Sequence, residues 1–189
     1  MKTTLLIFFI FGTLLPSFAQ TEIGNIVLPN QQTFGKHTLI LNGAGIKEKW
    51  WMDMFVGGLY LPTKSQDAKA ILESKNPIAV KLHIVSNLIS SSRLVEAIDD
   101  GFQKSMQGNT AAIEKEIENF KAFFQEKVSK NDVFDFVHEP GLGLVVYKNN
   151  RQIGRVASED FRVAFFRMWL SETPAMPEMK EAMLGVAEK

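Results

Sequence analysis

Residues 54–61 contain no charged side chain, although four of the seven residues before them are charged. An uncharged run of this length is typical of a strand buried on both faces. Gly57 and Gly58 interrupt the run where a core strand would carry large side chains, and glycines there allow a helix, another backbone or a ligand to come close. We therefore predict a single long strand over residues 43–61 that is ended by Pro62. Its first half is partly exposed to water, and its second half, residues 54–61, is covered on both faces.

Short strands and amphipathic helices account for most of the remaining chain. Alternation at period two and turn signals predict strands over residues 22–28, 33–41, 78–85, 133–138, 142–148 and 152–156. Apolar stripes at helical spacing predict helices over residues 67–74, 94–106 and 113–128, from residue 158 onward, and over about 178–184. Because strands cluster early and late with helices between them, the expected class is α+β, with a mostly antiparallel sheet covered on one face.

The first 19 residues have the pattern of a secretory signal peptide. Lys2 precedes an apolar run from Leu5 to Leu15, and the segment ends in a small residue, Phe18 and Ala19. The run is too short for a membrane anchor, which needs about 20 residues. We expect cleavage after Ala19, a single domain over residues 20–189, a periplasmic or secreted location, and no transmembrane anchor in the mature protein.

Composition excludes several classes of function. The chain has no cysteine, and its three histidines are isolated from one another, so we expect neither a metal nor another cofactor. Loss of Lys2 leaves 20 basic against 21 acidic side chains. A balance this even argues against a nucleic-acid partner. The 15 phenylalanines and 8 methionines indicate a large apolar interior.

Several segments together resemble the bacterial secreted branch of the chalcone isomerase-like family. They are GAGIK and FVGGLYLP in the long strand, VKLHIVSNLISSSRLVEAIDDGF in the middle, and PGLGLVVYKNNRQIG, DFRVAFFRMWLSETP and LG toward the end. The resemblance implies an open-faced β-sandwich of chalcone isomerase type. In that fold a large antiparallel sheet carries helices on one face, and a ligand cleft lies between sheet and helices.

The resemblance also implies where a ligand would bind, and there the chain departs from the family. Lys47 takes the place of an arginine, so the planar guanidinium fork of that arginine is absent from this chain. Phe55 takes the place of a threonine or tyrosine, which loses a hydroxyl. Arg93 takes the place of a tyrosine found in the plant enzymes of the family, and Asp100 takes the place of an asparagine. The departures weaken the reading as an isomerase, whose catalysis needs groups preset for developing charge.

We expect a non-catalytic binder of an amphipathic small molecule, most naturally a fatty acid or similar carboxylate lipid. Lys47 and Arg93 would contact the head, while Phe55, Gly57 and Phe102 would surround the tail. Two alternatives stay open at this point. One is a chalcone isomerase-type intramolecular lyase, and the other is an envelope accessory protein that has a protein partner and no ligand.

Overall fold

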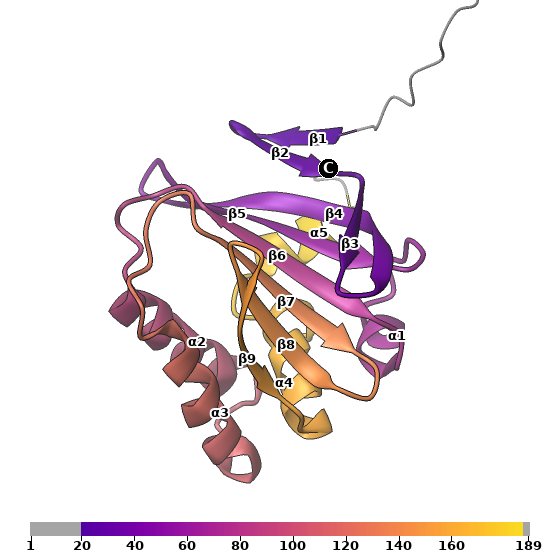
Figure 1. Cartoon of the computed structure of the whole chain (residues 1–189), viewed down its shortest axis with the longest axis vertical. Coiled ribbons are helices and arrows are strands. Elements are labelled where there is room, and N and C mark those ends of the chain that lie inside the picture. The colour runs from indigo at the N-terminus through magenta and orange to yellow at the C-terminus, as the bar shows by residue number, and fades with distance from the viewer. Residues whose placement is uncertain (1–19, 187–189) are drawn as a thin grey trace, which may run out of the picture.

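A seven-stranded antiparallel sheet forms the centre of the protein. The computed structural model describes residues 20–186. The sheet strands follow chain order from one edge to the other: β3 (Gln31–Phe34), β4 (His37–Lys49), β5 (Met52–Leu61), β6 (Ile78–Ile84), β7 (Val133–Glu139), β8 (Gly143–Lys148) and β9 (Arg151–Val156). Each strand is therefore paired with its neighbours in sequence, which is a simple meander (Figure 1).

Five helices accompany the sheet: α1 (Ala68–Glu73), α2 (Ser91–Ser105), α3 (Glu114–Lys121), α4 (Glu159–Leu170) and α5 (Pro177–Met183). Short 3-10 turns, η1 (Ala111–Ile113) and η2 (Ala122–Phe124), flank α3. Side-chain caps begin two of the long helices, because Ser90 accepts from the Arg93 amide and Ser158 from the Phe161 amide. The apolar faces of these helices pack on one face of the sheet and give the fold its main core.

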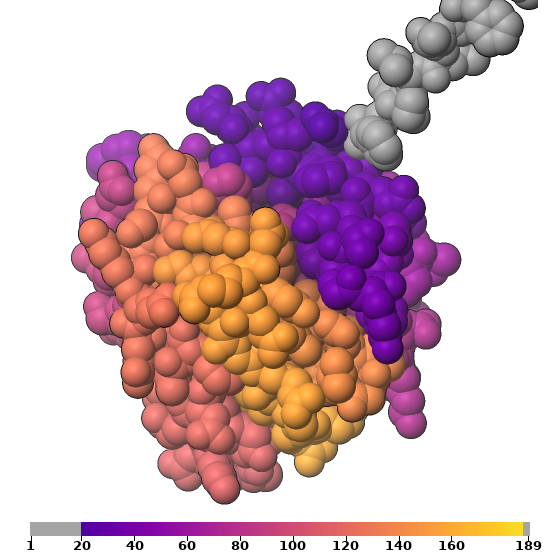
Figure 2. All heavy atoms as spheres, viewed as in Figure 1, coloured from indigo at the N-terminus to yellow at the C-terminus, as the bar shows by residue number. Residues whose placement is uncertain are grey.

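The opposite face of the sheet is only partly covered. A separate hairpin of β1 (Gln20–Ile23) and β2 (Ile26–Pro29) lies with β3 over one part of it, and Figure 2 shows the indigo atoms of these strands beside the orange atoms of the last strands. A second, smaller core fills the space beneath them, where the Tyr60 hydroxyl donates to the Pro29 carbonyl oxygen at 3.0 Å. The predicted open-faced β-sandwich is therefore confirmed.

A buried ion pair lies on this second face. Lys81 and Asp135 are cross-strand neighbours, and the Lys81 Nζ lies 2.6 Å from Asp135 Oδ1 and 5.5 Å from the centre of the Phe34 ring. Burial raises the pKa of the Asp135 carboxyl, although the Lys81 charge opposes that shift. The pair lies under Phe34 of β3, so it belongs to the contact between the N-terminal strands and the sheet.

The glycines of β4 and β5 form the seat of α5. A Cβ at Gly57 would lie 2.7 Å from Met179 Cε and 3.1 Å from Met183 Cε, and one at Gly45 would lie 2.6 Å from Ala182 Cβ. All three distances are shorter than ordinary van der Waals contact, so larger residues at these positions would crowd the side chains of α5. The expectation that a ligand fills the space at Gly57 is corrected by this packing, since two methionines of α5 occupy it.

The single strand predicted over residues 43–61 is wrong, because the chain reverses at Trp50 and Trp51. Lys49 pairs with Met52, which leaves a two-residue turn whose φ angles are 48° at Trp50 and 58° at Trp51. Two positive φ angles are typical of a type I′ turn, which normally contains Asn or Gly. No such residue is present here, so the turn has no ordinary sequence signal.

Residues 1–19, on which the signal-peptide prediction rests, lie outside the described residues. Within residues 20–186, no helix is both long enough and apolar enough to cross a membrane.

Candidate functional site

A deep pocket of about 790 Å³ lies between the helix-bearing face of the sheet and helices α2 and α4. Its floor is apolar and comes from several elements: Leu82, Ile84 and Phe136 of the sheet, Ile98 of α2, Phe120 of α3, and Phe165 of α4. All of these side chains are buried. Volumes of roughly 300–1,000 Å³ with mostly apolar walls are usual for small-molecule sites.

The exposed part of the lining includes charged side chains of both signs, beside the exposed apolar side chains of Trp50 and Leu88. Lys47 and Lys49 come from the end of β4, and Arg93 comes from the first turn of α2. Glu96 and Asp100 of α2 contribute the opposing charges. We call these five residues the rim. These five residues place three cations and two carboxylates above an apolar interior.

Lys47 is already paired in this structure. Its ammonium group donates to Glu178 in the first turn of α5, and the two side chains keep 31% and 46% of their accessible surface. The hydrogen bond from Lys47 is the largest influence holding the pKa of Glu178 below its ordinary value. A ligand carboxylate at Lys47 would therefore compete with a carboxylate of the protein itself.

Arg93 has more of its hydrogen-bonding capacity available. Its Nη1 donates to the Leu88 carbonyl oxygen at 2.8 Å, which fixes the guanidinium against the loop before α2. Within residues 20–186 no carboxylate lies within ion-pair distance of Arg93. Asp99 of the same helix pairs instead with Lys121 at 3.0 Å. The guanidinium has five N–H donors, so several remain for an anion.

Two aromatic side chains of the lining differ in polarity. Phe55, on β5, lies across from Lys47 in the β4–β5 register and supplies only an apolar ring. Trp169, on α4, is 6% exposed, and its indole Nε1–H is buried without a hydrogen-bond partner among the described residues. Buried donors are nearly always satisfied in proteins. The Trp169 indole N–H is an unpaired donor among residues 20–186, and the surrounding side chains leave its nitrogen almost no accessible surface.

The sequence-predicted site residues divide into two groups. Lys47, Phe55 and Arg93 line the same pocket, as the prediction required. Gly57 lies under α5 and Phe102 packs on Phe161 with 5.3 Å between ring centres, and neither belongs to the lining. Phe102 is displaced because it occupies the side of α2 that faces the core between α2 and α4, away from the pocket.

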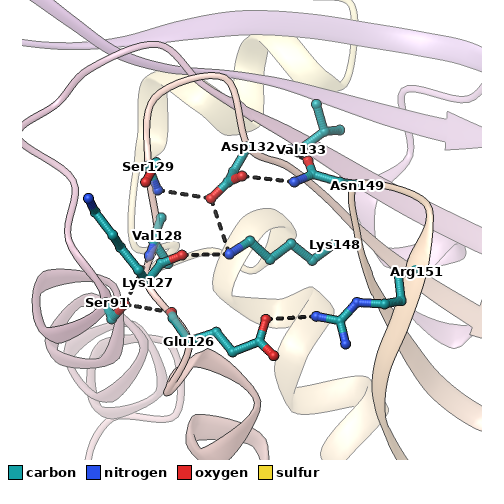
Figure 3. A network of polar contacts seen from close by, with 10 residues as sticks. All are labelled: Ser91, Glu126, Lys127, Val128, Ser129, Asp132, Val133, Lys148, Asn149 and Arg151. Carbon is teal, nitrogen blue, oxygen red and sulfur yellow. Dashed lines mark hydrogen bonds and ion pairs between the residues drawn. The ribbon is translucent and has the colours of Figure 1, made fainter.

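A polar network holds the N-terminal end of α2, which carries Arg93 (Figure 3). Ser91 donates to the Glu126 carbonyl oxygen at 2.8 Å and accepts from the Val128 amide at 3.0 Å. The loop that contains residues 126–128 is in turn tied to the β8–β9 hairpin, since Lys148 donates to the Lys127 carbonyl oxygen at 2.6 Å.

The same network continues to the turn of that hairpin (Figure 3). Lys148 lies 3.2 Å from Asp132, and Asn149 donates to Asp132 at 2.8 Å while accepting from the Val133 amide at 2.8 Å. These bonds hold the pKa of Asp132 below its ordinary value in spite of its burial. The first turn of α2 is thus fixed to the sheet by paired polar groups, which sets the place of Arg93 on the rim.

Sequence reasoning missed several residues of the site. Lys49 and Trp50 line the pocket because the chain turns at Trp50, and the turn carries no Asn or Gly that could have announced it. Gly101 also lines the pocket, and a Cβ there would lie 2.9 Å from Met168 Sδ, so this glycine lets α2 and α4 approach closely. Among residues 20–186 no cluster of potential metal ligands occurs.

Comparison with solved structures finds the same fold in a plant protein. The crystal structure of a fatty-acid binding protein from Arabidopsis thaliana superposes with a TM-score of 0.66 at 16% sequence identity, covering 85% of this chain and 92% of that one. No curated protein sequence matches the chain significantly. A sequence model of the family described as chalcone isomerase-like matches residues 20–185, which is nearly all of the described chain. The protein therefore belongs to the chalcone isomerase-like family.

Proposed function

We propose that the protein binds an amphipathic carboxylate lipid, such as a long-chain fatty acid, in the pocket between the sheet and α2. The observation that carries this proposal is the combination of an apolar interior of about 790 Å³ with cationic groups at its rim. The pocket is not filled by the protein's own phenylalanines. Phe120, Phe136 and Phe165 form its walls and leave the space between them open.

The energetics favour a molecule with one charged end. Each methylene transferred from water into the apolar interior stabilises the complex by about 0.8 kcal/mol. The head would lie at Lys47, Lys49 and Arg93, where charge-assisted hydrogen bonds to a carboxylate are strong. The rim carboxylates Glu96 and Asp100 restrict the positions that an anionic head can take.

Two further observations support the proposal. The Arabidopsis thaliana protein of the same fold is named as a fatty-acid binding protein. The signal-like pattern of residues 1–19 supports export, so we propose a periplasmic or secreted location for the binder. An exported carrier would keep a sparingly soluble lipid in solution outside the cytoplasm.

A direct test compares palmitate with hexadecanol, which has the same tail and no charge. Calorimetric titration of delipidated protein should show binding of palmitate, and the double substitution Lys47→Ala/Arg93→Ala should weaken it by about tenfold or more, the range expected for losing charged hydrogen bonds. Hexadecanol binding should change much less. The matched control is Lys69→Ala on α1, where an exposed lysine lies outside the pocket lining.

Native mass spectrometry of freshly purified protein gives an independent readout, since a resident lipid would appear as added mass. The proposal fails if delipidated protein binds neither palmitate nor hexadecanol. A selective failure with palmitate would leave an apolar pocket without a carboxylate site and would remove Lys47 and Arg93 from the proposal.

A further inference from the structure

We propose that the tip of the β4–β5 hairpin, residues 49–52, docks on the surface of a phospholipid bilayer and places the pocket rim against the membrane. The side chains of Trp50 and Trp51 are 71% and 91% exposed. Two adjacent tryptophans with this exposure stand out, because large aromatic side chains are normally mostly buried. Indole rings are favoured at the interface between lipid and water, where one end is apolar and the other is wet.

The backbone gives an independent reason to regard the two indoles as selected for a role at the surface. Trp50 and Trp51 have φ angles of 48° and 58°, in the left-handed region that bulky residues disfavour. The β8–β9 hairpin of the same chain has the same two-residue turn, with φ angles of 51° and 65°, and there the residues are Asn149 and Asn150. The β4–β5 turn therefore carries indoles at positions of positive φ, where the β8–β9 turn carries asparagines that tolerate this conformation.

Charge is separated between the two faces of this hairpin. Lys47 and Lys49 line the pocket, and the Lys49 ammonium lies 5.4 Å from the centre of the Trp50 ring. Glu48 and Asp53 are cross-strand neighbours in the β4–β5 register, and neither lines the pocket. The pocket side of the tip thus presents cations beside the Trp50 indole, which is complementary to phosphate headgroups above an acyl region.

The hairpin tip is continuous with the pocket and with a neighbouring apolar side chain. The Met54 carbonyl oxygen, two residues after the tip, accepts from the Val85 and Ser86 amides at 3.0 and 3.2 Å, so the β6–α2 loop lies beside it (Figure 1). Leu88 of that loop is 41% exposed and lines the same pocket as Trp50. A bilayer that receives the indoles would therefore lie against the pocket rim.

The area of the tip favours a bilayer over a protein partner. Two indoles offer about 150–250 Å² each, whereas a standard protein interface needs about 800 Å² from each partner. A narrow projecting hairpin suits insertion between headgroups, which needs no matching surface. Docking does not require a guest in the pocket, so it can fail or succeed independently of the proposed lipid binding.

Vesicle sedimentation tests the proposal with protein free of lipid. The native protein should bind phosphatidylcholine vesicles and bind more tightly when phosphatidylglycerol is included. Trp51→Asn, which reproduces a residue of the β8–β9 turn, should lower partitioning by about tenfold or more. Trp51 does not line the pocket, so palmitate binding in solution should stay unchanged. Lys49→Gln should weaken binding only to the anionic vesicles.

Leu142→Asn is the matched control, because Leu142 is 40% exposed in the β7–β8 turn at the other end of the sheet. This variant should partition like the native protein. A spectroscopic arm uses Trp169→Phe, which leaves Trp50 and Trp51 as the only indoles of the chain, and their emission should shift to the blue on vesicle addition. Absence of native binding to both vesicles, or equal binding by Trp51→Asn, would overturn the proposal and assign the tip to a protein partner.

Discussion

Lys47 on β4 and Glu178 in the first turn of α5 form an ion pair beside the pocket, and the sequence separates them by 131 positions. The pair joins the rim to the last described helix. Because the pocket would hold a carboxylate at Lys47, Glu178 occupies the place that the head of a guest would take. The protein thus supplies its own competitor for an anionic ligand.

Glu178→Gln should therefore increase the affinity for palmitate. The substitution removes the competing charge and leaves a side chain of similar size, and the gain should be about two- to fivefold, which corresponds to the 0.5–1 kcal/mol of a partly exposed ion pair. Calorimetric titration measures it directly. Glu181→Gln on the same helix is the control, and an equal gain there would show a general effect of charge instead of competition at Lys47.

The glycines of β4 and β5 that lie under α5 should differ in their tolerance of a methyl group. A Cβ at Gly43 would meet backbone atoms of α5 and its C-terminal end, including Met183 O at 2.8 Å and Gly185 N at 2.7 Å, whereas one at Gly57 would meet the flexible end of Met179. Gly43→Ala should therefore lower the free energy of unfolding by about 1–3 kcal/mol, and Gly57→Ala by clearly less. Urea denaturation gives both values, and equal losses would contradict the backbone explanation.

His138 should make stability depend on pH below neutrality. Burial, followed by the nearby Arg162 charge, holds the pKa of His138 below its ordinary value of about 6.5. The unfolded chain therefore binds more protons below that value, so the free energy of unfolding should fall as the pH drops from 7 toward 5. One such proton gives a slope of at most about 1.4 kcal/mol per pH unit.

Urea denaturation at several pH values measures this slope, and His138→Gln should reduce it. The comparison variant is His83→Gln, because burial also lowers the pKa of His83. This substitution leaves the part of the slope that is due to His138 in place. If His138→Gln kept the full native slope, other groups would have to carry the dependence.

The β4–β5 turn should become more stable when its indoles are replaced. Trp50→Asn/Trp51→Gly matches the residues to the positive φ angles and should raise the free energy of unfolding by about 1 kcal/mol. Thermal denaturation measures the gain, which should accompany loss of vesicle binding. A large loss of stability would show that the indoles contribute to the fold itself.

The later strands and the helices were predicted well, because period-two and helical patterns survive in a meander whose neighbours in the chain are neighbours in space. The strands predicted over residues 22–28 and 33–41 are wrong as single strands, because the first contains the turn between β1 and β2 and the second the turn between β3 and β4. The resemblance to the chalcone isomerase-like family, read from the glycine-rich strand and the later segments, is confirmed by the family match over residues 20–185. The strand boundary at Trp50 was missed, since its turn lacks the residues that normally mark one.

The site was harder to predict than the fold. Phe55 and the rim cations Lys47 and Arg93 could be placed because the family resemblance aligned them, and their role in binding stays a prediction. Gly57 could not be placed from the sequence, because a glycine leaves the same pattern whether a ligand or a helix fills the space above it. The methionines that fill it lie about 120 residues later in the chain, at Met179 and Met183. Phe102 was misplaced because it lies on the side of α2 that packs on Phe161.

The seat of α5 also has a consequence for the order of folding. Strands of the meander can pair with their neighbours as soon as both exist, but Asn42 of β4 makes a hydrogen bond of 2.8 Å to the carbonyl oxygen of Met183, 141 positions away. During synthesis the glycine-rich backbone of β4 stays uncovered by α5 until almost the entire domain has emerged. A ribosome-bound chain that stops short of residue 177 would expose this strip, and chaperones that recognise uncovered sheet surface should bind it there.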